Sequence, residues 1–389
     1  MSLRAEVSSL PRPVWVLFAG TLVNRLGGFV LFFLILYLRQ KGYSVPQAGL
    51  ALSAYGVGGV AAAFIGGHLA DRIGRRNTIV VSMFLSSATV LALSQAQALS
   101  TIVVVTALTG LSAELYRPAA SALVADLTAP GERVTAFAVY RIAVNLGVAV
   151  GPAMGGFLAD RSFFSLFVID AVTSALFAVI ALFALPNTRG EPATGGKPRG
   201  SVRVILGDRG FLVFLAASLL GSIVFMQFNG TLPLQIRAHG FPNSLYGIMM
   251  SINGALVLIF ELPLSSLTRR RPAPGVMALG LLLIGLGFSL TGANASPVAL
   301  IVAVIVWTSG EIVFVPVAAA YVANIAPGDM RGRYQGMWAG TWSASHILAP
   351  ALGTAVFAVS PPLLWSLCAA TGLVAAMVML AVAPARAHN

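Results

Sequence analysis

Acidic side chains lie inside long apolar stretches of this sequence, where they could carry protons. Glu311 is near the middle of one stretch, and no Lys or Arg lies within one helical turn of it in sequence. If the stretch crosses a membrane, a charge at its centre costs about 2.5–3.5 kcal/mol, so the group usually faces a cavity or a partner. A carboxyl at that depth can load a proton on one side and release it on the other. Glu114 is a second candidate for proton coupling.

Aromatic residues recur at four-residue spacing around such a carboxyl. Trp307 lies four residues before Glu311, and Trp338, Trp342 and His346 repeat every four residues further along. Residues four apart share one face of a helix. Aromatic rings beside a carboxylate suit a lipophilic cation through cation–π contact. Helix packing or interfacial anchoring is the alternative for each tryptophan, and a satisfied core position is the alternative for His346.

Three arginines also fall inside apolar stretches. Arg117 follows Glu114 by three residues, Arg141 precedes Asn145 by four, and Arg25 lies in the first stretch. Either these groups form a static polar network that holds helices together, or they handle substrate or protons. The residues predicted to line a substrate cavity are Asn24, Arg25, Arg117, Arg141, Asn145, Gln227, Trp307, Trp338, Trp342 and His346.

The composition excludes a water-soluble protein. Of 389 residues, 58% are hydrophobic and 9% are charged, against roughly 25% charged in ordinary soluble domains, and the mean hydropathy is +0.89. The net charge of +12 therefore indicates membrane topology rather than nucleic-acid binding. The sequence contains no phosphate-binding loop, dinucleotide fingerprint, nucleophile elbow or metal-ligand spacing. We expect no enzyme, no cofactor and no metal, and a monomer whose partners are the lipid bilayer, a small-molecule substrate and protons.

Apolar stretches of about 20 residues, the length of a membrane-spanning helix, occur twelve times. The predicted spans are 14–38, 47–69, 78–96, 100–123, 135–159, 163–185, 210–235, 245–267, 275–293, 297–322, 334–358 and 361–383. They predict an all-α integral membrane fold.

Loop charges predict its orientation. With the N-terminus inside, 17 of the 24 Lys and Arg lie in inner loops and ends, and 3 lie within spans. The 4 on the outer side are Arg39, Lys41, Arg161 and Arg237. Because Lys and Arg collect in cytoplasmic loops, both termini are predicted to be cytoplasmic.

The chain resembles a duplication. Residues 1–185 and 210–389 each hold six predicted spans, and the Gly- and Pro-rich residues 186–209 read as a flexible cytoplasmic linker. Arg39 and Gly42 recur as Arg237 and Gly240 at an offset of 198. Glu114 and Glu311 recur at an offset of 197. Two pseudo-symmetric six-helix bundles are therefore predicted, with coincidence among many Gly and Pro as the alternative.

The loop after the second span carries a spaced set of Gly, Asp and Arg. Gly67 is predicted to allow close contact with another helix. Asp71 at the membrane edge can face a helix N-terminus, whose partial positive charge favours it. Arg75 or Arg76 can pair with Asp126 at the inner end of the fourth span. The predicted conformational latch comprises Gly67, Asp71, Arg72, Gly74, Arg75, Arg76 and Asp126. A loop that only fixes topology is the alternative.

Here the sequence resembles the major facilitator superfamily, whose loop motif G-x-x-x-D-R-x-G-R-R matches residues 67–76 throughout. The resemblance covers the whole chain and implies the major facilitator fold. It also implies that Asp71, Arg72 and Arg75 stabilise the outward-open form.

The fifth span carries a second motif. Gly147, Gly151 and Gly155 repeat every four residues and form a face that another helix can approach closely, while Pro152 favours a kink. With Gly156 the run resembles the superfamily's antiporter motif, G-x-x-x-G-P-x-x-G-G. An ordinary small-residue interface is the alternative.

The resemblance and the intramembrane acids together predict a proton-driven exporter. We expect an antiporter of the multidrug type in the cytoplasmic (inner) membrane of a bacterium, exporting small lipophilic or cationic compounds by alternating access. An exporter of an endogenous metabolite such as a sugar, an amino acid or a lipid-like solute, or a non-transporting membrane sensor of the same fold, is the alternative.

Overall fold

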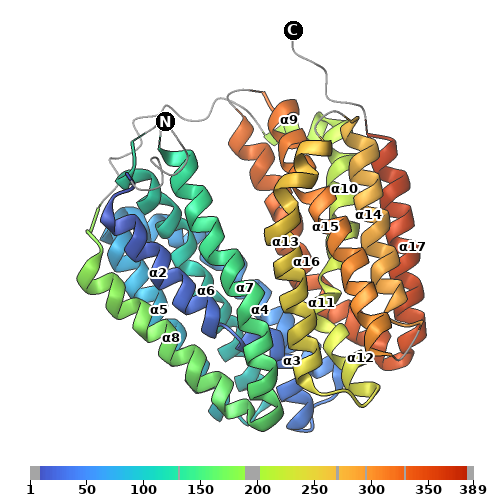
Figure 1. The fold of residues 1–389 in the computed structure, drawn as a ribbon, viewed down its shortest axis with the longest axis horizontal. Coiled ribbons are helices and arrows are strands. Elements are labelled where there is room, and N and C mark those ends of the chain that lie inside the picture. The colour runs from blue at the N-terminus through green and yellow to red at the C-terminus, as the bar shows by residue number, and fades with distance from the viewer. Residues whose placement is uncertain are drawn as a thin grey trace. The chain divides into compact units, whose positions relative to one another are not determined.

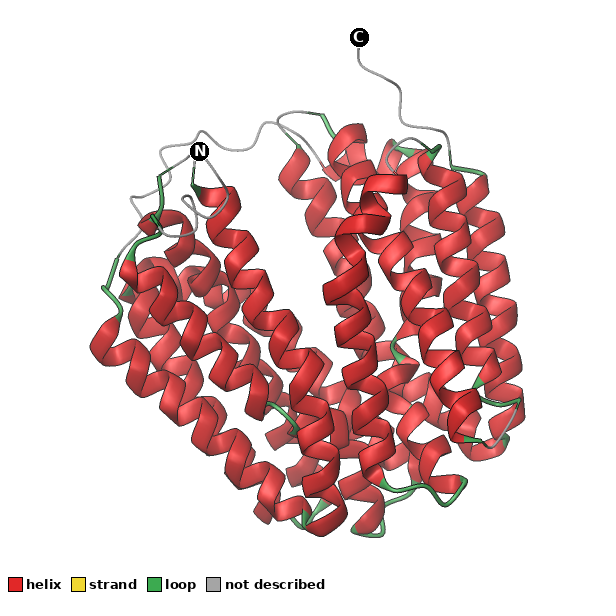
Figure 2. Ribbon diagram, in the orientation of Figure 1, coloured by secondary structure: helices red, strands yellow, loops and turns green. Residues whose placement is uncertain are grey.

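The computed structural model describes residues 9–129, 132–188, 202–268, 271–293, 296–327 and 330–382. Every regular element within these ranges is a helix (Figure 1, Figure 2). The helices are α2 (Arg12–Gly27), α3 (Val30–Gln40), α4 (Val45–Ile73), α5 (Arg75–Gln95), α6 (Leu99–Leu127), α7 (Arg133–Arg161), α8 (Phe163–Ala184), α9 (Val202–Gly207), α10 (Arg209–Phe225), α11 (Gln227–Gly230), α12 (Leu232–Ala238), α13 (Asn243–Thr268), α14 (Ala273–Leu290), α15 (Pro297–Ile325), α16 (Arg331–Val359) and α17 (Pro361–Leu380).

In the described part of the chain, twelve helical segments of 18 to 29 residues are long and apolar enough to cross a membrane. This confirms the twelve predicted spans. Helices suit this environment because they satisfy every backbone hydrogen bond within one segment. Of the predicted linker 186–209, residues 189–201 lie outside the described residues. The remainder includes the short helix α9.

The first and seventh spans are broken, whereas the sequence predicted continuous helices. The first span breaks between α2 and α3 at Gly28 and Phe29, where the Phe29 amide donates to the Gly27 carbonyl at 2.8 Å. Two consecutive glycines favour such a break because they restrict the backbone least. The seventh span breaks at Met226 and Thr231. Here Pro233 removes one helical donor.

The predicted duplication is visible in where the helices begin. The helices α4, α5, α6, α7 and α8 begin 198 residues before α13, α14, α15, α16 and α17, respectively. The turns after α3 and α12 also match. Gly42 and Gly240 have φ of +90° and +80°, a region that glycine enters without a steric penalty. Tyr43 donates to the Leu38 carbonyl at 3.1 Å, as Phe241 does to that of Ile236 at 3.2 Å.

The same helix register corrects one pair in the predicted repeat. The internal prolines Pro118 of α6 and Pro316 of α15 are 198 residues apart, so Glu311 corresponds to Ala113 and not to Glu114. A displacement of one residue rotates a side chain by about 100° around the helix axis. The two glutamates therefore occupy different faces of corresponding helices.

The chain divides into two compact units. Unit 1 comprises Met1–Thr194 and Pro242–Gly254, and unit 2 comprises Gly195–Phe241 and Ala255–Asn389. Each has its own apolar core. Buried members of the unit 1 core include Leu17, Tyr116, Leu123 and Phe177. Those of the unit 2 core include Phe211, Phe214, Phe314, Trp338 and Met379. The predicted bundle boundaries, 1–185 and 210–389, stay a prediction.

Candidate functional site

Glu311 lies in a narrow pocket of unit 2 that has aromatic walls. The other lining residues are Gly221, Ser222, Phe225, Leu281, Ile284, Phe314, Val315 and Trp342. The Ser222 hydroxyl donates to the Ser218 carbonyl at 2.7 Å. The empty space amounts to about 220 Å³ with its open side included, and it is too narrow to hold a water molecule. A ligand can therefore enter this pocket only if side chains such as Trp342 move, whereas Glu311 itself is partly exposed.

Phe225 joins two of the predicted tryptophans. Its ring centroid lies 5.6 Å from that of Trp307 and 5.7 Å from that of Trp342. Trp307 is 1% exposed and stacks on Phe288 at 5.2 Å. Trp342 thus lines the pocket, and Trp307 packs behind Phe225. Phe225 was not predicted as a site residue, because nothing in its sequence spacing shows that two other helices bring tryptophans to it.

Two further predicted cavity residues lie in α16. Trp338 is buried in the unit 2 core, with its ring 6.4 Å from that of Phe214. His346 places Nδ1 2.8 Å from the Trp342 carbonyl oxygen. A carbonyl can only accept, so Nδ1 of His346 carries the hydrogen.

Arg25, Glu114 and Arg117, predicted polar residues of unit 1, contact neighbouring side chains. Arg25 Nη2 donates to the Tyr116 hydroxyl at 3.0 Å, and its buried Nε has no hydrogen-bond partner among the described residues. Glu114 Oε2 lies 2.7 Å from Arg117 Nε, and Glu114 Oε1 accepts from the Tyr55 hydroxyl at 3.5 Å. Because the Arg117 side chain is 52% exposed and that of Glu114 20%, solvent screens this ion pair.

The remaining predicted residues of this group occupy α2 and α7. Asn24 Nδ2 donates to Ser174 Oγ at 3.0 Å. On α7, Arg141 is exposed and Asn145 is partly exposed.

The structure also shows a role for Asp170, which is 8% exposed. Its Oδ2 accepts from the Val30 amide at 3.2 Å, so this carboxyl caps α3 where the first span is broken.

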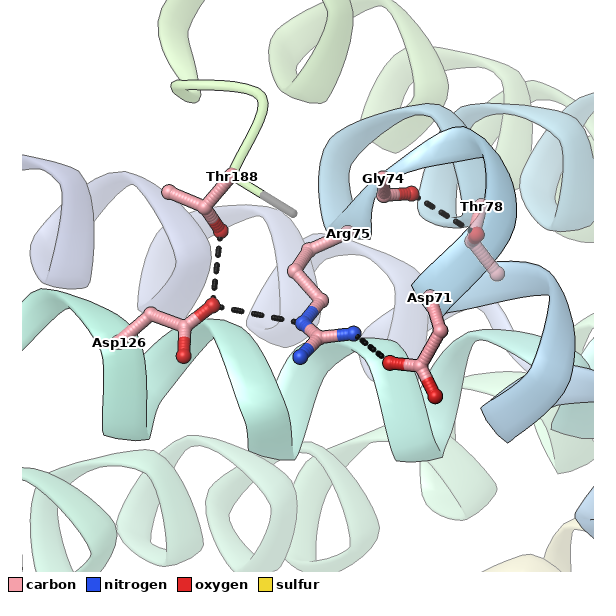
Figure 3. A network of polar contacts seen from close by, with 6 residues as sticks. All are labelled: Asp71, Gly74, Arg75, Thr78, Asp126 and Thr188. Atoms are coloured by element: carbon pink, nitrogen blue, oxygen red, sulfur yellow. Dashed lines mark hydrogen bonds and ion pairs between the residues drawn. The ribbon is translucent and has the colours of Figure 1, made fainter. Parts of the chain in front are cut away.

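Arg75 connects the predicted latch residues (Figure 3). Its Nη1 lies 2.5 Å from Asp71 Oδ1, and its Nε lies 3.3 Å from Asp126 Oδ2. Asp126 Oδ2 also accepts from the Thr188 hydroxyl at 2.9 Å. The guanidinium of Arg75, at the start of α5, thus ties the end of α4 to the end of α6, and Asp126 links α6 to the segment after α8.

Gly74 is required at the turn inside this network. Its φ is +96°, and a Cβ there would lie 2.2 Å from Asn187 Oδ1. Arg72 is exposed, and Arg76 Nε donates to Asn77 Oδ1 at 3.3 Å.

Removing the guanidinium should destabilise this region. We expect Arg75→Gln to lower the free energy of unfolding by about 2 kcal/mol, because hydrogen bonds to charged groups contribute about 1.5–3 kcal/mol and the Arg75 side chain is only 9% exposed. Thermal unfolding in detergent measures the change. The neighbouring exposed Arg72 supplies the control, since Arg72→Gln should change stability by less than about 0.5 kcal/mol. Equal effects of the two substitutions would contradict the role assigned to Arg75.

The close helix approach predicted at Gly67 occurs one residue earlier. A Cβ at Gly66 would lie 2.6 Å from the Leu115 carbonyl oxygen of α6, whereas one at Gly67 would have no heavy atom within 4 Å. The prediction was wrong because residues one apart point about 100° apart on a helix, and only the neighbouring helix decides which of the two glycines faces it.

The glycines of the predicted antiporter motif lie against the broken first span. A Cβ at Gly147 would lie 2.3 Å from Arg25 Cβ, and one at Gly151 would lie 2.9 Å from the Arg25 carbonyl oxygen. At Gly155 it would lie 2.8 Å from Phe29 Cδ1. The motif therefore allows α7 to reach the backbone of α2 at the residue whose guanidinium bonds Tyr116.

A second face of the same motif contacts the part of α13 that belongs to unit 1. A Cβ at Gly247 would lie 2.2 Å from the Pro152 carbonyl oxygen, and one at Gly156 would lie 2.7 Å from Ser244 Cα. At the end of α7, Asp160 accepts from the amides of Asn243 at 2.7 Å and Ser244 at 3.0 Å. This carboxylate satisfies donors at the α13 N-terminus that have no intrahelical partner.

Buried polar side chains follow the broken seventh span. Gln227, Thr231, Gln235 and His239 succeed one another at four-residue spacing, and the first three are 2%, 0% and 6% exposed. The Thr231 hydroxyl donates to Gln227 Oε1 at 2.8 Å. Gln227 was predicted as a cavity residue, and it packs into the space left by Gly353. The four-residue spacing in the sequence could have indicated all four residues, but only Gln227 was predicted as a cavity residue.

Twelve membrane-crossing helices with charged and aromatic groups between them define a multi-pass membrane transport protein. The chain belongs to the Major Facilitator Superfamily, whose family model matches residues 17–272 and 228–389. It is accordingly a transporter and not an enzyme.

Three curated relatives match most of the chain at 26–27% identity. An uncharacterized MFS-type transporter YqjV of Bacillus subtilis is 27% identical over 87% of this chain and 85% of its own. A Na(+), Li(+), K(+)/H(+) antiporter of Planococcus maritimus is 26% identical over 82% and 83%. Multidrug resistance protein MdtH of Yersinia enterocolitica is 26% identical over 86% and 84%.

Solved structures share the fold at lower identity. A peptide transporter POT in complex with sulfate superposes with a TM-score of 0.81 at 18% identity, covering 98% of each chain. A D-xylose-proton symporter superposes with a TM-score of 0.76 at 14% identity, covering 96% of this chain and 97% of its own. At these identities the likeness concerns the fold alone.

Proposed function

We propose that this transporter is a proton-coupled antiporter that exports small lipophilic or cationic compounds by alternating access. It would work in a bacterial cytoplasmic membrane with both termini inside. The observation that carries the proposal is the position of Glu311 in unit 2, in a pocket walled by Phe225, Phe314 and Trp342. A carboxylate can hold either a proton or a cation, and aromatic walls suit a lipophilic one.

Antiport follows if a proton and a cationic substrate compete for Glu311. Proton entry would neutralise the carboxyl and release the substrate outside, and proton loss to the cytoplasm would prepare it for the next cation. For an uncharged lipophilic substrate, one proton that crosses about 100 mV releases roughly 2.3 kcal/mol, and at about 1.4 kcal/mol per factor of ten this sustains an outward gradient of about fortyfold without ATP. For a monovalent cation, exchange with one proton moves no net charge, so the pH difference alone drives it and sustains about tenfold per pH unit.

The two motifs support the conformational part of the proposal. Alternation needs contacts that form in one state and break in the other. The Arg75 network can serve as such a contact, in agreement with the role that the superfamily motif gives it in the outward-open form. One relative is named as a cation/proton antiporter, which supports antiport. Another is named as a multidrug resistance protein, which supports drug export.

The export of an endogenous metabolite is the second candidate, and an observation in unit 1 favours it. Arg25, Arg117 and Glu114 place two cations and one anion in the spans of one unit. Such a set suits a substrate that carries a carboxylate or both signs of charge, as amino acids do.

Competition between protons and a lipophilic cation tests the proposal. We expect tetraphenylphosphonium to raise the melting temperature of the purified transporter at pH 8, and its apparent affinity to fall as pH is lowered, by at most tenfold per pH unit for a single proton. In proteoliposomes, its outward movement should be accompanied by inward proton flux. Binding of amino acids or sugars in its place would favour the metabolite alternative. An affinity independent of pH would contradict proton competition.

A further inference from the structure

Gln235 and His239, two of the polar residues at four-residue spacing along the seventh span, form hydrogen bonds that have no part in the proposed function. Gln235 of α12 lies between two side chains. The Trp365 indole Nε1 of α17 donates to Gln235 Oε1 at 3.1 Å, and Gln235 Nε2 lies 2.7 Å from His239 Nε2. Both Trp365 and Gln235 are buried, at 2% and 6% exposed.

The indole fixes the direction of both hydrogen bonds. An indole N–H can only donate, so the oxygen of the Gln235 amide must face Trp365. The amide NH₂ group then faces His239 and donates, so His239 Nε2 must be the acceptor. A neutral imidazole with an acceptor at Nε2 carries its hydrogen at Nδ1. The contacts thus assign both the charge and the tautomer of His239.

Protonation of His239 is incompatible with this arrangement. An imidazolium has a hydrogen on each nitrogen, so its Nε2–H would face the Gln235 NH₂ at 2.7 Å. If the amide turns over to accept from His239, its NH₂ group faces the Trp365 N–H instead. One of the two hydrogen bonds is lost in either case. His239 is only partly buried, but a turned-over amide keeps the charge-assisted hydrogen bond from the imidazolium, which is the stronger kind, and the buried Trp365 N–H then loses its acceptor.

We propose that Trp365, Gln235 and His239 form a proton-responsive site in which binding of a proton to His239 Nε2 breaks the hydrogen bond that ties α12 to α17. The proposal deepens the proposed function and rests on it for one point, the placement of His239 on the outer side of the membrane. Outer protons would then loosen the outer end of the seventh span. Imidazole is suited to this because it changes charge between pH 5 and 8 in proteins.

The surroundings of His239 contain little other charge among the described residues. Arg237 lies on the same helix, and its Nη1 donates to the Phe241 carbonyl at 3.0 Å. The helices α11 and α17 carry no Asp, Glu, Lys or Arg. The described residues after α14, where Gly292 packs on the Trp365 ring, are also uncharged. On α16, Arg331 and Arg333 lie at the start of the helix, far from its end beside Trp365.

His346 supplies a matched contrast in the same unit. Its Nδ1 donates to the Trp342 carbonyl, and an imidazolium keeps that hydrogen. Protonation of His346 therefore leaves its observed contact intact, whereas protonation of His239 does not.

Nitrogen NMR of the full-length protein labelled with ¹⁵N-histidine tests the assignment. At pH 8 we expect His239, assigned through His239→Gln, to show the Nδ1–H tautomer. In Trp365→Phe the amide is free to turn over, so the Nε2–H tautomer of His239 should appear. A wild-type protein with Nε2–H at pH 8, or a Trp365→Phe variant with an unchanged tautomer, would overturn the proposal.

The indole signal of Trp365 tests the switch itself. In wild type we expect its N–H resonance to move when the pH is lowered from 8 to 5. The movement should vanish in His239→Gln, whose neutral amide can still accept, and persist in His346→Gln. Persistence in His239→Gln would overturn the switch.

Transport is a separate readout: the ratio of rates at outer pH 5.5 and 7.5 should move toward one in His239→Gln. If neither the wild type nor any variant shows proton-coupled transport, the proposed function is refuted. The NMR results would still test the proton-responsive site of Trp365, Gln235 and His239.

Discussion

Glu311→Gln is expected to abolish proton-driven substrate accumulation while leaving the protein folded. Glutamine has nearly the size of glutamate but cannot take up or release a proton, so the coupling step has no carrier. The outward gradient of a monovalent cation, about tenfold per pH unit for exchange with one proton, should fall to none. Proteoliposomes with an imposed pH gradient measure this loss, and facilitated exchange without a gradient reports whether the variant still binds and moves substrate.

Two substitutions of the same kind serve as controls. Glu261 of α13 also lies in a span, and Glu261→Gln is expected to retain coupling because Glu261 does not line the pocket around Glu311. Glu114→Gln tests the second candidate, whose carboxylate is already paired with Arg117 at 2.7 Å. Full proton-driven transport by Glu311→Gln would refute the assignment. Loss of coupling in Glu114→Gln alone would move the proton site to unit 1.

The fold was predictable because its main determinant is local. A span needs about 20 apolar residues, and twelve such stretches can be counted directly. The breaks at Gly28 and Met226 were missed, since one Gly–Gly pair or one downstream proline does not by itself show whether a helix stops or bends. The broken first span became visible only through its partners, among them Asp170, which caps α3.

The candidate site was predictable in its residue types but not in its contacts. The four-residue spacing of Trp307 and Glu311 on α15 predicts one shared helix face. Trp307 is nevertheless buried against Phe288 and Phe225. The orientation of each side chain depends on which neighbouring helix supplies a surface. For the same reason, Phe225 was not predicted as a site residue, and the close contact with α6 that was expected at Gly67 occurs at Gly66.

The predicted antiporter motif of α7 allows a prediction about packing that does not depend on the substrate. Gly151→Leu is expected to destabilise unit 1 and to remove transport. A Cβ at Gly151 would lie 2.9 Å from the Arg25 carbonyl oxygen and 3.3 Å from that of Leu26. Both atoms are backbone, so they cannot rotate away as a side chain can. Overpacking of this kind costs about 1–3 kcal/mol, measurable as a lower melting temperature in detergent.

The adjacent Val150 provides the matched control, because it is 40% exposed and points away from the face that Gly151 presents to α2. Val150→Leu adds bulk at nearly the same depth and should leave stability and transport unchanged. If Gly151→Leu lowers stability but Gly151→Ala keeps part of the transport, the motif acts through the distance between α7 and Arg25, because the smaller side chain displaces α2 less. If Val150→Leu and Gly151→Leu behave alike, close packing against α2 is not what the motif provides, and the link from these glycines to Arg25 is lost.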